Sequence, residues 1–232
     1  MTMQVDGAGA SEPWLLSLLR FTSPTLPIGS YAYSRGLESA VHAGDVHDEA
    51  SARTWIVGLL QHTAARLDGA ILWRLLAAFA HDDREQVEAW NARLLASRES
   101  AELRLEDTQL GAALARLLAG QGVSAAQAFM SRADVCYATL FALAAISFEI
   151  PAAAALQGFL WAQAESQCSA AVRLIPLGQT AGQRLLAACA AVVPACAELA
   201  RTLPDAAIGA FAPGLAIASA LHETQYTRLF RS

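Results

Sequence analysis

Side chains with metal-binding potential are few in this sequence, and most of them lie around one turn. Borderline divalent metals such as nickel accept nitrogen and oxygen donors, and four such donors fall close together here: His42, Asp45, His47 and Asp48. Exposed His and Asp side chains in a loop are much more common than metal sites. The pattern therefore favours a solvated turn and leaves His42 and His47 as the candidate metal ligands.

No other motif predicts catalysis or a tightly bound cofactor. The sequence contains no HExxH zinc motif and no recognisable Ser, His and Asp triad. All 16 basic residues are Arg, which excludes a P-loop and Schiff-base chemistry, because both need a Lys amine. A nucleotide used by this protein is therefore expected on a P-loop partner. Glu149, Glu165 and Arg173 lie in apolar stretches, where buried polar groups with partners are the usual finding, so we predict a non-catalytic protein.

The composition indicates a folded protein that binds other proteins. The 232 residues are 55% hydrophobic and only 16% charged, against about 25% charged residues in an average domain. Such a chain buries a sizeable core, and its surplus of apolar residues predicts surfaces that other proteins cover. The net charge is −5 and no run of Arg stands out, so few cations are available to neutralise a nucleic-acid backbone. We expect no nucleic-acid partner.

The cysteines and the apolar stretches predict a cytoplasmic protein. None of the four cysteines has CxxC spacing, and residues 1–11 lack the basic start and apolar run of a signal peptide. The most apolar stretches, 135–148 and 150–164, are bounded by charged residues and fall short of the roughly 18 residues that a membrane span needs. We therefore expect buried helices and no membrane association.

The elements that position these residues are predicted to be helices. Ala, Leu, Arg, Gln and Glu dominate, and β-branched runs with a period of two do not occur in the sequence. Apolar residues recur at helical spacing in roughly nine or ten segments with short connections, which indicates a single compact all-α domain. After a flexible N-terminus over 1–11, this domain spans 12–232, with a first helix from residue 13 and others over 30–43, 48–79, 84–97, 99–119, 134–147, 151–174, 178–201 and 215–230.

Three segments depart from this helical pattern, and the first covers residues 23–38. It reads SPTLPIGSYAYSRGLE. Pro24 and Pro27 favour an extended entry, and Gly29 permits a positive φ next to Tyr31. The segment is either a rigid connection between helices or a surface built for recognition.

The second segment, residues 173–184, reads RLIPLGQTAGQR and joins two apolar helices. Pro176 ends the first helix. Gly178 and Gly182 lie one helical turn apart, a spacing that suits close packing of a neighbouring helix. The pattern lacks the preceding strand and the Lys of a phosphate-binding loop, so we favour the packing interpretation.

The third segment, residues 222–232, reads HETQYTRLFRS. Tyr226 and Phe230 lie four residues apart, and Arg228 and Arg231 supply forked hydrogen-bond donors. Tyr and Arg are enriched at the hot spots of protein interfaces. The segment is therefore either docked onto the protein's own core or ordered against a partner.

Together with a fourth segment, these residues resemble the urease accessory protein UreF family. Residues 23–38 are similar to the family's S-P-x-L-P-x-G-x-[FY]-x-[YF]-S-x-G-[LI]-E start, and SRESAELR at 97–104, followed by Gln109 and Gly111, is similar to its R-E-T-x-E-x-R-x-x-S/T-x-Q-x-G run. Ser100 stands where Thr is common. IPLGQTAGQRLL and HETQYTRLFRS also match, so the resemblance covers about residues 15–232 and leaves the first ten without a counterpart.

The resemblance implies a non-catalytic, α-helical scaffold or chaperone that forms a homodimer and serves nickel insertion into apo-urease. The implied partners are UreD, also called UreH, and UreG, a P-loop GTPase that carries nickel. Nickel would then be cargo in transit, and GTP would be bound by UreG. The scaffold would couple the hydrolysis of this GTP to the release of nickel. The absence of Lys and the interface-like terminal segment agree with this expectation.

The resemblance also assigns residues to partner surfaces, with residues 215–232 ordered as a helix and tail against UreD. Charges alternate at helical spacing over residues 98–104 and form either an internal ion-pair network or an interface. The carried-over residues are Pro24, Gly29, Tyr31, Ser34, Gly36, Glu38, Arg98, Glu99, Glu102, Arg104, Arg173, Pro176, Gly178, Gln179, His222, Glu223, Gln225, Tyr226, Arg228, Leu229, Phe230 and Arg231.

The alternative function is a metallochaperone that binds nickel in its own right. Such a protein needs a tight metal site, and the five His residues form no His-rich tract. Equilibrium dialysis of the lone protein with nickel distinguishes the two functions.

Overall fold

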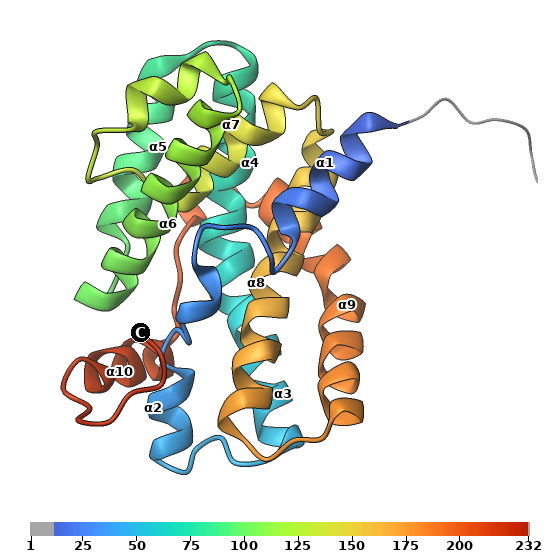
Figure 1. The fold of residues 1–232 in the computed structure, drawn as a ribbon, viewed down its shortest axis with the longest axis vertical. Coiled ribbons are helices and arrows are strands. Elements are labelled where there is room, and N and C mark those ends of the chain that lie inside the picture. The colour runs from blue at the N-terminus through green and yellow to red at the C-terminus, as the bar shows by residue number, and fades with distance from the viewer. Residues whose placement is uncertain (1–11, 232) are drawn as a thin grey trace, which may run out of the picture.

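Ten α-helices account for most of the chain in the computed structural model, which describes residues 12–231 (Figure 1). No strand occurs within that range, so the all-α prediction is confirmed; the segment predicted to be flexible, 1–11, lies outside it. The α-helices are α1 (Pro13–Thr22), α2 (Leu37–His42), α3 (Glu49–Leu59), α4 (Ala70–Ala80), α5 (Arg84–Ala96), α6 (Ala101–Gly120), α7 (Tyr137–Ser147), α8 (Ala152–Leu174), α9 (Gln179–Thr202) and α10 (Pro213–His222).

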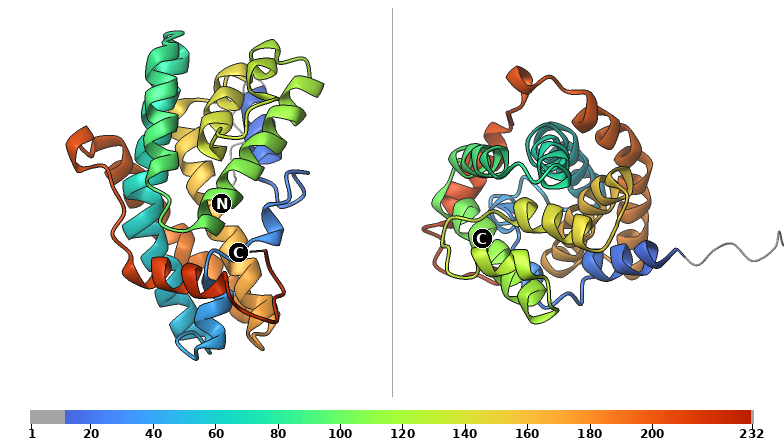
Figure 2. Two further views of the ribbon diagram at one scale, coloured as in Figure 1. Left: turned by 90° about the vertical axis from the view of Figure 1, so that its left-hand side faces the viewer. Right: turned by 90° about the horizontal axis from the view of Figure 1, so that it is seen from above.

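The core forms around helices with little polar surface. Every residue of α7 from Tyr137 to Ala145 is buried, which follows from an apolar sequence without a polar face. α7 packs against α4 and α6, and α8 packs against α9. The rings of Phe141 and Phe159 join α7 to α8 at 5.2 Å between centroids. Seen from above, α4 and α8 run through the middle of the molecule (Figure 2).

α3 and α4 belong to one continuous rod that runs from Glu49 to Ala80. The helix predicted over 48–79 does continue through the intervening residues, Leu60–Gly69, but as a π-helical segment, η2. π-helical turns inside α-helices are rare and are found mostly at functional positions. Here the segment carries Asp68, which is 3% exposed, into the interior.

The helix predicted over 30–43 is wrong in its first half. A short 3-10 turn, η1 (Ser30–Ala32), is followed by α2, which begins only at Leu37. Arg35 and Gly36 both have a positive φ, of 51° and 76°, a conformation that breaks a right-handed helix. The break allows α10 to approach, because a Cβ at Gly36 would lie 3.1 Å from the backbone nitrogen of Ser219.

The helix predicted over 215–230 is also too long. α10 ends at His222, and residues 223–231, which we call the tail, turn back over α2 and the N-terminus of α6 (Figure 1). Helical spacing in the tail sequence predicted a helix, but the main chain of Leu229 and Phe230 hydrogen-bonds to a side chain of α2 instead.

One described helix, α9, is long and apolar enough to cross a membrane when judged by length and composition alone. α9 packs against α8 and the rod, and its Arg184 pairs with Glu49 at 2.5 Å. A single helix of this kind is weak evidence for a membrane span.

We predict that Gly111→Ala lowers the free energy of unfolding by about 2–3 kcal/mol, as overpacking does. A Cβ at Gly111 would overlap the carbonyl oxygen of Val135 and lie 3.0 Å from the carbonyl carbon of Cys136. That backbone cannot yield, because Asn91 binds Cys136 N and Asp107 binds Tyr137 N. Urea unfolding measures the loss.

The matched control is Gly58→Ala in α3. No atom lies within 4 Å of a Cβ at Gly58, so the gain in helix propensity should raise stability by about 0.5–1 kcal/mol. Equal effects at the two glycines would contradict the packing argument.

Candidate functional site

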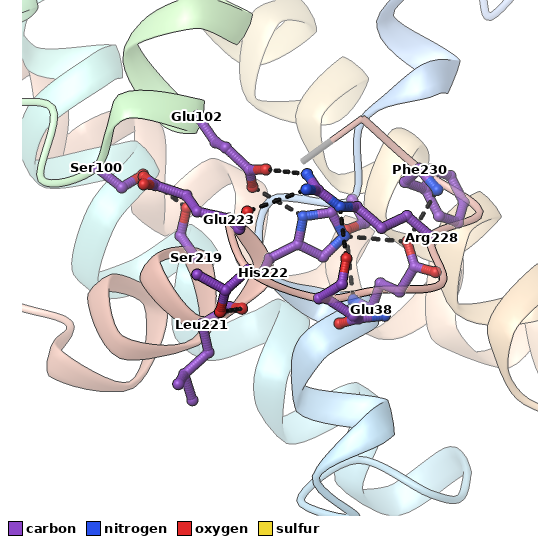
Figure 3. Close-up of polar contacts among 12 residues, drawn as sticks. Glu38, Ser100, Glu102, Ser219, Leu221, His222, Glu223, Arg228 and Phe230 are labelled. Atoms are coloured by element: carbon purple, nitrogen blue, oxygen red, sulfur yellow. Dashed lines mark hydrogen bonds and ion pairs between the residues drawn. The ribbon is translucent and has the colours of Figure 1, made fainter.

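A buried histidine lies between two carboxylates where α10 meets α2 and α6 (Figure 3). His222 is 0% exposed. Its Nδ1 lies 2.8 Å from Glu102 Oε2, and its Nε2 lies 3.2 Å from Glu38 Oε2. Each ring nitrogen of His222 therefore lies within hydrogen-bond distance of one carboxylate oxygen, so the imidazole joins Glu102 to Glu38.

Glu38 also holds the main chain of the tail. Leu229 N donates to its Oε1 at 2.6 Å, and Phe230 N donates to its Oε2 at 2.8 Å. The Phe230 side chain is buried, and the guanidinium of Arg173 lies 4.5 Å from its ring centroid. In η1, Ala32 O accepts from Arg231 N at 2.7 Å. The Glu38 carboxylate therefore fixes the end of the tail on the α2 side.

Glu102 and Arg228 fix the beginning of the tail. Arg228 Nη1 donates to Glu102 Oε1 at 2.8 Å, and its Nη2 donates to the carbonyl oxygen of Glu223 at 3.0 Å. Glu223 Oε1 in turn accepts from Ala101 N in the first turn of α6. These contacts join four side chains into one cluster, which we call the tail clamp: Glu38, Glu102, His222 and Arg228.

The clamp leaves the apolar side chains of the tail free to meet solvent. Tyr226 is fully exposed and Leu229 is 56% exposed, and Ile217 and Leu221 of α10 are also exposed. Large exposed apolar groups on a fixed backbone are typical of surfaces that bind other proteins. The structure thus confirms docking on the protein's own core for Phe230 and leaves Tyr226 and Leu229 exposed; order against a partner stays a prediction.

The residues predicted over 23–38 lie at this site or beside it. Gly36 and Glu38 contact α10 and the tail directly, and Ser34 O accepts from Gln167 of α8 at 2.9 Å. Tyr31 is 66% exposed, and its carbonyl oxygen accepts from Arg173. Tyr31 and Pro24 also line one pocket next to Arg35, while Gly29 is the positive-φ residue before η1. Their roles toward partners stay predictions.

Some residues of the second segment, 173–184, and of the fourth, 97–104, lie at the site, and others do not. Arg173 reaches the tail, whereas Pro176, Gly178 and Gln179 are exposed where α8 joins α9. In the fourth segment, Glu99 and Arg104 are exposed, and Glu102 belongs to the tail clamp. The remaining member, Arg98, enters a different buried cluster.

The second buried cluster is built around Arg98. Its Nη2 donates to Asp68 Oδ1 at 2.6 Å, and its Nε donates to Asp107 Oδ2 at 2.9 Å. Arg35 pairs with Glu106 at 2.8 Å nearby. Burial raises the pKa of Asp68, but Arg98 and then Arg35 outweigh burial, so the net pKa lies below its ordinary value. This network ties η2 to α6.

The sequence indicated Arg98 as a candidate site residue, but it did not indicate the carboxylates that pair with it. Asp107 and Glu106 lie on the same α6 face as buried Leu103, Leu110 and Leu114, so a carboxylate amid apolar helix positions was the available signal. Asp68 and Arg35 stood inside the helices predicted over 48–79 and 30–43, and their spacing did not connect them to Arg98.

The candidate metal ligands do not converge. His47 Nδ1 lies 3.0 Å from Gly44 O, and Asp48 caps α3 by accepting from Ser51 N at 2.8 Å. His42 is exposed at the end of α2. Across residues 12–231, no group of three or more His, Cys, Asp or Glu side chains gathers in a way that could hold a metal ion.

Comparison with known proteins identifies the family. A family model described as UreF matches residues 46–190. The chain is 50% identical to urease accessory protein UreF 2 of Brucella anthropi, over 94% of this chain and 96% of that protein. It is 48% identical to urease accessory protein UreF of an Azoarcus species, over 99% and 100% of the two chains, and 43% identical to that of a Janthinobacterium species. With similarity that runs from end to end, the chain belongs to the UreF family of urease accessory proteins.

Proposed function

We propose that this chain is a non-catalytic scaffold that bridges UreD and the GTPase UreG and couples GTP hydrolysis on UreG to nickel delivery into apo-urease. UreF proteins are accessory proteins of urease maturation, and the proposal adds the partners and the coupling. The scaffold acts in the cytoplasm as a homodimer, with nickel as cargo in transit and GTP bound by UreG.

The observation that carries the proposal is the clamped but exposed tail. A frayed terminus presents no defined surface, whereas here Glu38 holds the main chain of Leu229 and Phe230, and Glu102 holds Arg228. A surface held in place before binding loses less conformational entropy when a partner docks. The clamp connects the tail to α2 through Glu38, and Arg173 connects Phe230 of the tail to the carbonyl oxygen of Tyr31. One partner on the tail and another on residues 23–38 would therefore meet through contacting residues.

A double substitution at exposed positions tests the proposal without disturbing the clamp. Tyr226→Ser with Leu229→Ser removes two exposed side chains, and residues of this kind at an interface centre contribute about 2 kcal/mol or more each. We expect at least ~30-fold weaker binding to UreD at an unchanged melting temperature. Purification of the chain co-expressed with UreD and UreG, followed by stoichiometry measurement, provides the readout.

The control is Met130→Ser, which is also exposed but lies on the connection between α6 and α7. It should leave the complex intact. Normal complex formation by the double variant would contradict the proposed role of the tail. A lowered melting temperature of that variant would mean that the two side chains contribute to folding as well as to binding.

A further inference from the structure

Two cysteines that the proposed function does not use face each other between α8 and α9. The Sγ atoms of Cys168 and Cys189 lie 3.9 Å apart. Both residues are buried, with 2% and 1% exposure, and all four cysteines are free thiols. Cys196 lies two helical turns beyond Cys189 along α9, about 10 Å away.

The packing of the two helices allows a bond between these sulfurs. α8 and α9 are consecutive helices that pack against each other, and they approach closely on the connection side of the pair. There Gly182 offers no Cβ, and a Cβ would lie 2.9 Å from Val172 Cγ2. A disulfide needs an S–S distance of about 2.05 Å, so the two sulfurs must approach by about 2 Å, a change that side-chain rotation of both residues can share.

We propose that Cys168 and Cys189 form a modification site, a buried dithiol that hydrogen peroxide converts to an intrachain disulfide between α8 and α9. In the first step the Cys189 thiolate attacks one peroxide oxygen, the O–O bond breaks, and water leaves after proton transfer, so that Cys189 becomes a sulfenic acid. In the second step the Cys168 sulfur attacks the Cys189 sulfur, the S–S bond forms, and the S–O bond breaks to release a second water. The two thiols lose two electrons, and the peroxide gains them.

The contact between the thiols assigns their order of reaction. A hydrogen bond from Cys168 lowers the pKa of Cys189 and outweighs the opposing effect of burial, and the same hydrogen bond raises the pKa of Cys168. The thiolate is the nucleophile in such chemistry. Cys189 is therefore the attacking residue, and Cys168 is the resolving residue.

Burial selects the oxidant. With so little of either thiol exposed, a bulky disulfide such as oxidised glutathione cannot align with the Cys189 sulfur in the folded protein, because thiol exchange requires access. Hydrogen peroxide is close to water in size and reaches small internal sites. The pair is thus expected to discriminate between these two oxidants.

The experiment treats the folded, full-length chain with hydrogen peroxide or with oxidised glutathione, then unfolds it in the presence of an alkylating reagent and maps the peptides by mass spectrometry. We expect peroxide to give a linked Cys168–Cys189 peptide that is lighter by two hydrogen atoms, with Cys136 and Cys196 alkylated. Oxidised glutathione should leave all four thiols alkylated.

Two variants and a melting curve complete the test. Cys168→Ala should stop Cys189 at the sulfenic acid, which dimedone traps, and Cys196→Ala should leave the link unchanged. The linked protein should melt roughly 6–12 °C higher than the same sample with dithiothreitol, since the bond closes a loop of about 20 residues. The proposal is overturned if peroxide leaves the four thiols alkylatable, links a different pair, or oxidises Cys189 to a sulfinic acid without the link.

Discussion

Replacement of Arg98 by Met is expected to lower the free energy of unfolding by about 3–5 kcal/mol, the usual cost of removing one partner from a buried ion pair. The Arg98 side chain is 8% exposed, and it pairs with Asp68 and Asp107, whose side chains are 4% and 2% exposed. The substitution leaves two carboxylates in the interior without their shared cation. Urea unfolding at pH 7 measures the loss.

The contribution of Asp68 to stability should also reverse its pH dependence in this variant. In the wild type, the lowered pKa of Asp68 contributes stability that is present above the unfolded value near 4 and lost as pH falls through the folded value. Without Arg98, burial is no longer outweighed and should raise the folded pKa of Asp68. The contribution of Asp68 to stability is then largest below pH ~4 and is lost as pH rises toward its raised folded pKa. The difference in stability between variant and wild type should therefore shrink from pH 7 to pH 5.

The control is Arg104→Met in the same segment. Arg104 is exposed, and its replacement should change stability by no more than about 0.5 kcal/mol at either pH. A constant difference between Arg98→Met and wild type across this pH range would contradict the charge argument and would indicate lost packing instead.

Glu38→Gln is expected to release the end of the tail. The glutamine keeps the shape of Glu38, but it offers one acceptor oxygen and brings an NH2 donor to a site where the main-chain N–H groups of Leu229 and Phe230 both donate. Hydrogen bonds to a charged acceptor contribute about 1.5–3 kcal/mol. Amide exchange at Leu229 and Phe230 should therefore become roughly 10 to 100 times faster.

Binding to UreD should weaken by a similar factor if the clamp prepares the tail for its partner, as the proposed function requires. Glu99→Gln, an exposed carboxylate one turn from the clamp, is the matched control and should change neither quantity. Faster exchange with unchanged binding would mean that the partner does not use the clamped form of the tail. Unchanged exchange would mean that Glu38 does not hold it.

The long helices could be predicted from sequence because their determinants are local. The helix expected over 151–174 corresponds to α8 (Ala152–Leu174), and that over 178–201 to α9 (Gln179–Thr202), since Pro and Gly mark their ends. The two predicted helices with wrong bounds, over 30–43 and 215–230, both include residues of the tail clamp. Helical spacing over 30–43 and 215–230 was real, but positive φ at Gly36 and the hydrogen bonds of Glu38 to the tail overrode it.

The candidate site could be predicted as residues but not as a cluster. Glu38, Glu102, His222 and Arg228 each stood in a motif, yet Glu38 and His222 lie 184 positions apart along the chain. No spacing rule connects such distant positions. The same holds for Cys168 and Cys189, because whether two side chains face each other across two helices depends on how those helices pack.

Glu38 accepts hydrogen bonds from the amide nitrogens of Leu229 and Phe230. Every residue except proline supplies such an N–H group. The anchoring of the tail is thus largely indifferent to which side chains stand at positions 226 and 229. Substitutions at these two positions can therefore change the chemistry of the exposed surface while the hydrogen bonds that fix the main chain of the tail stay the same.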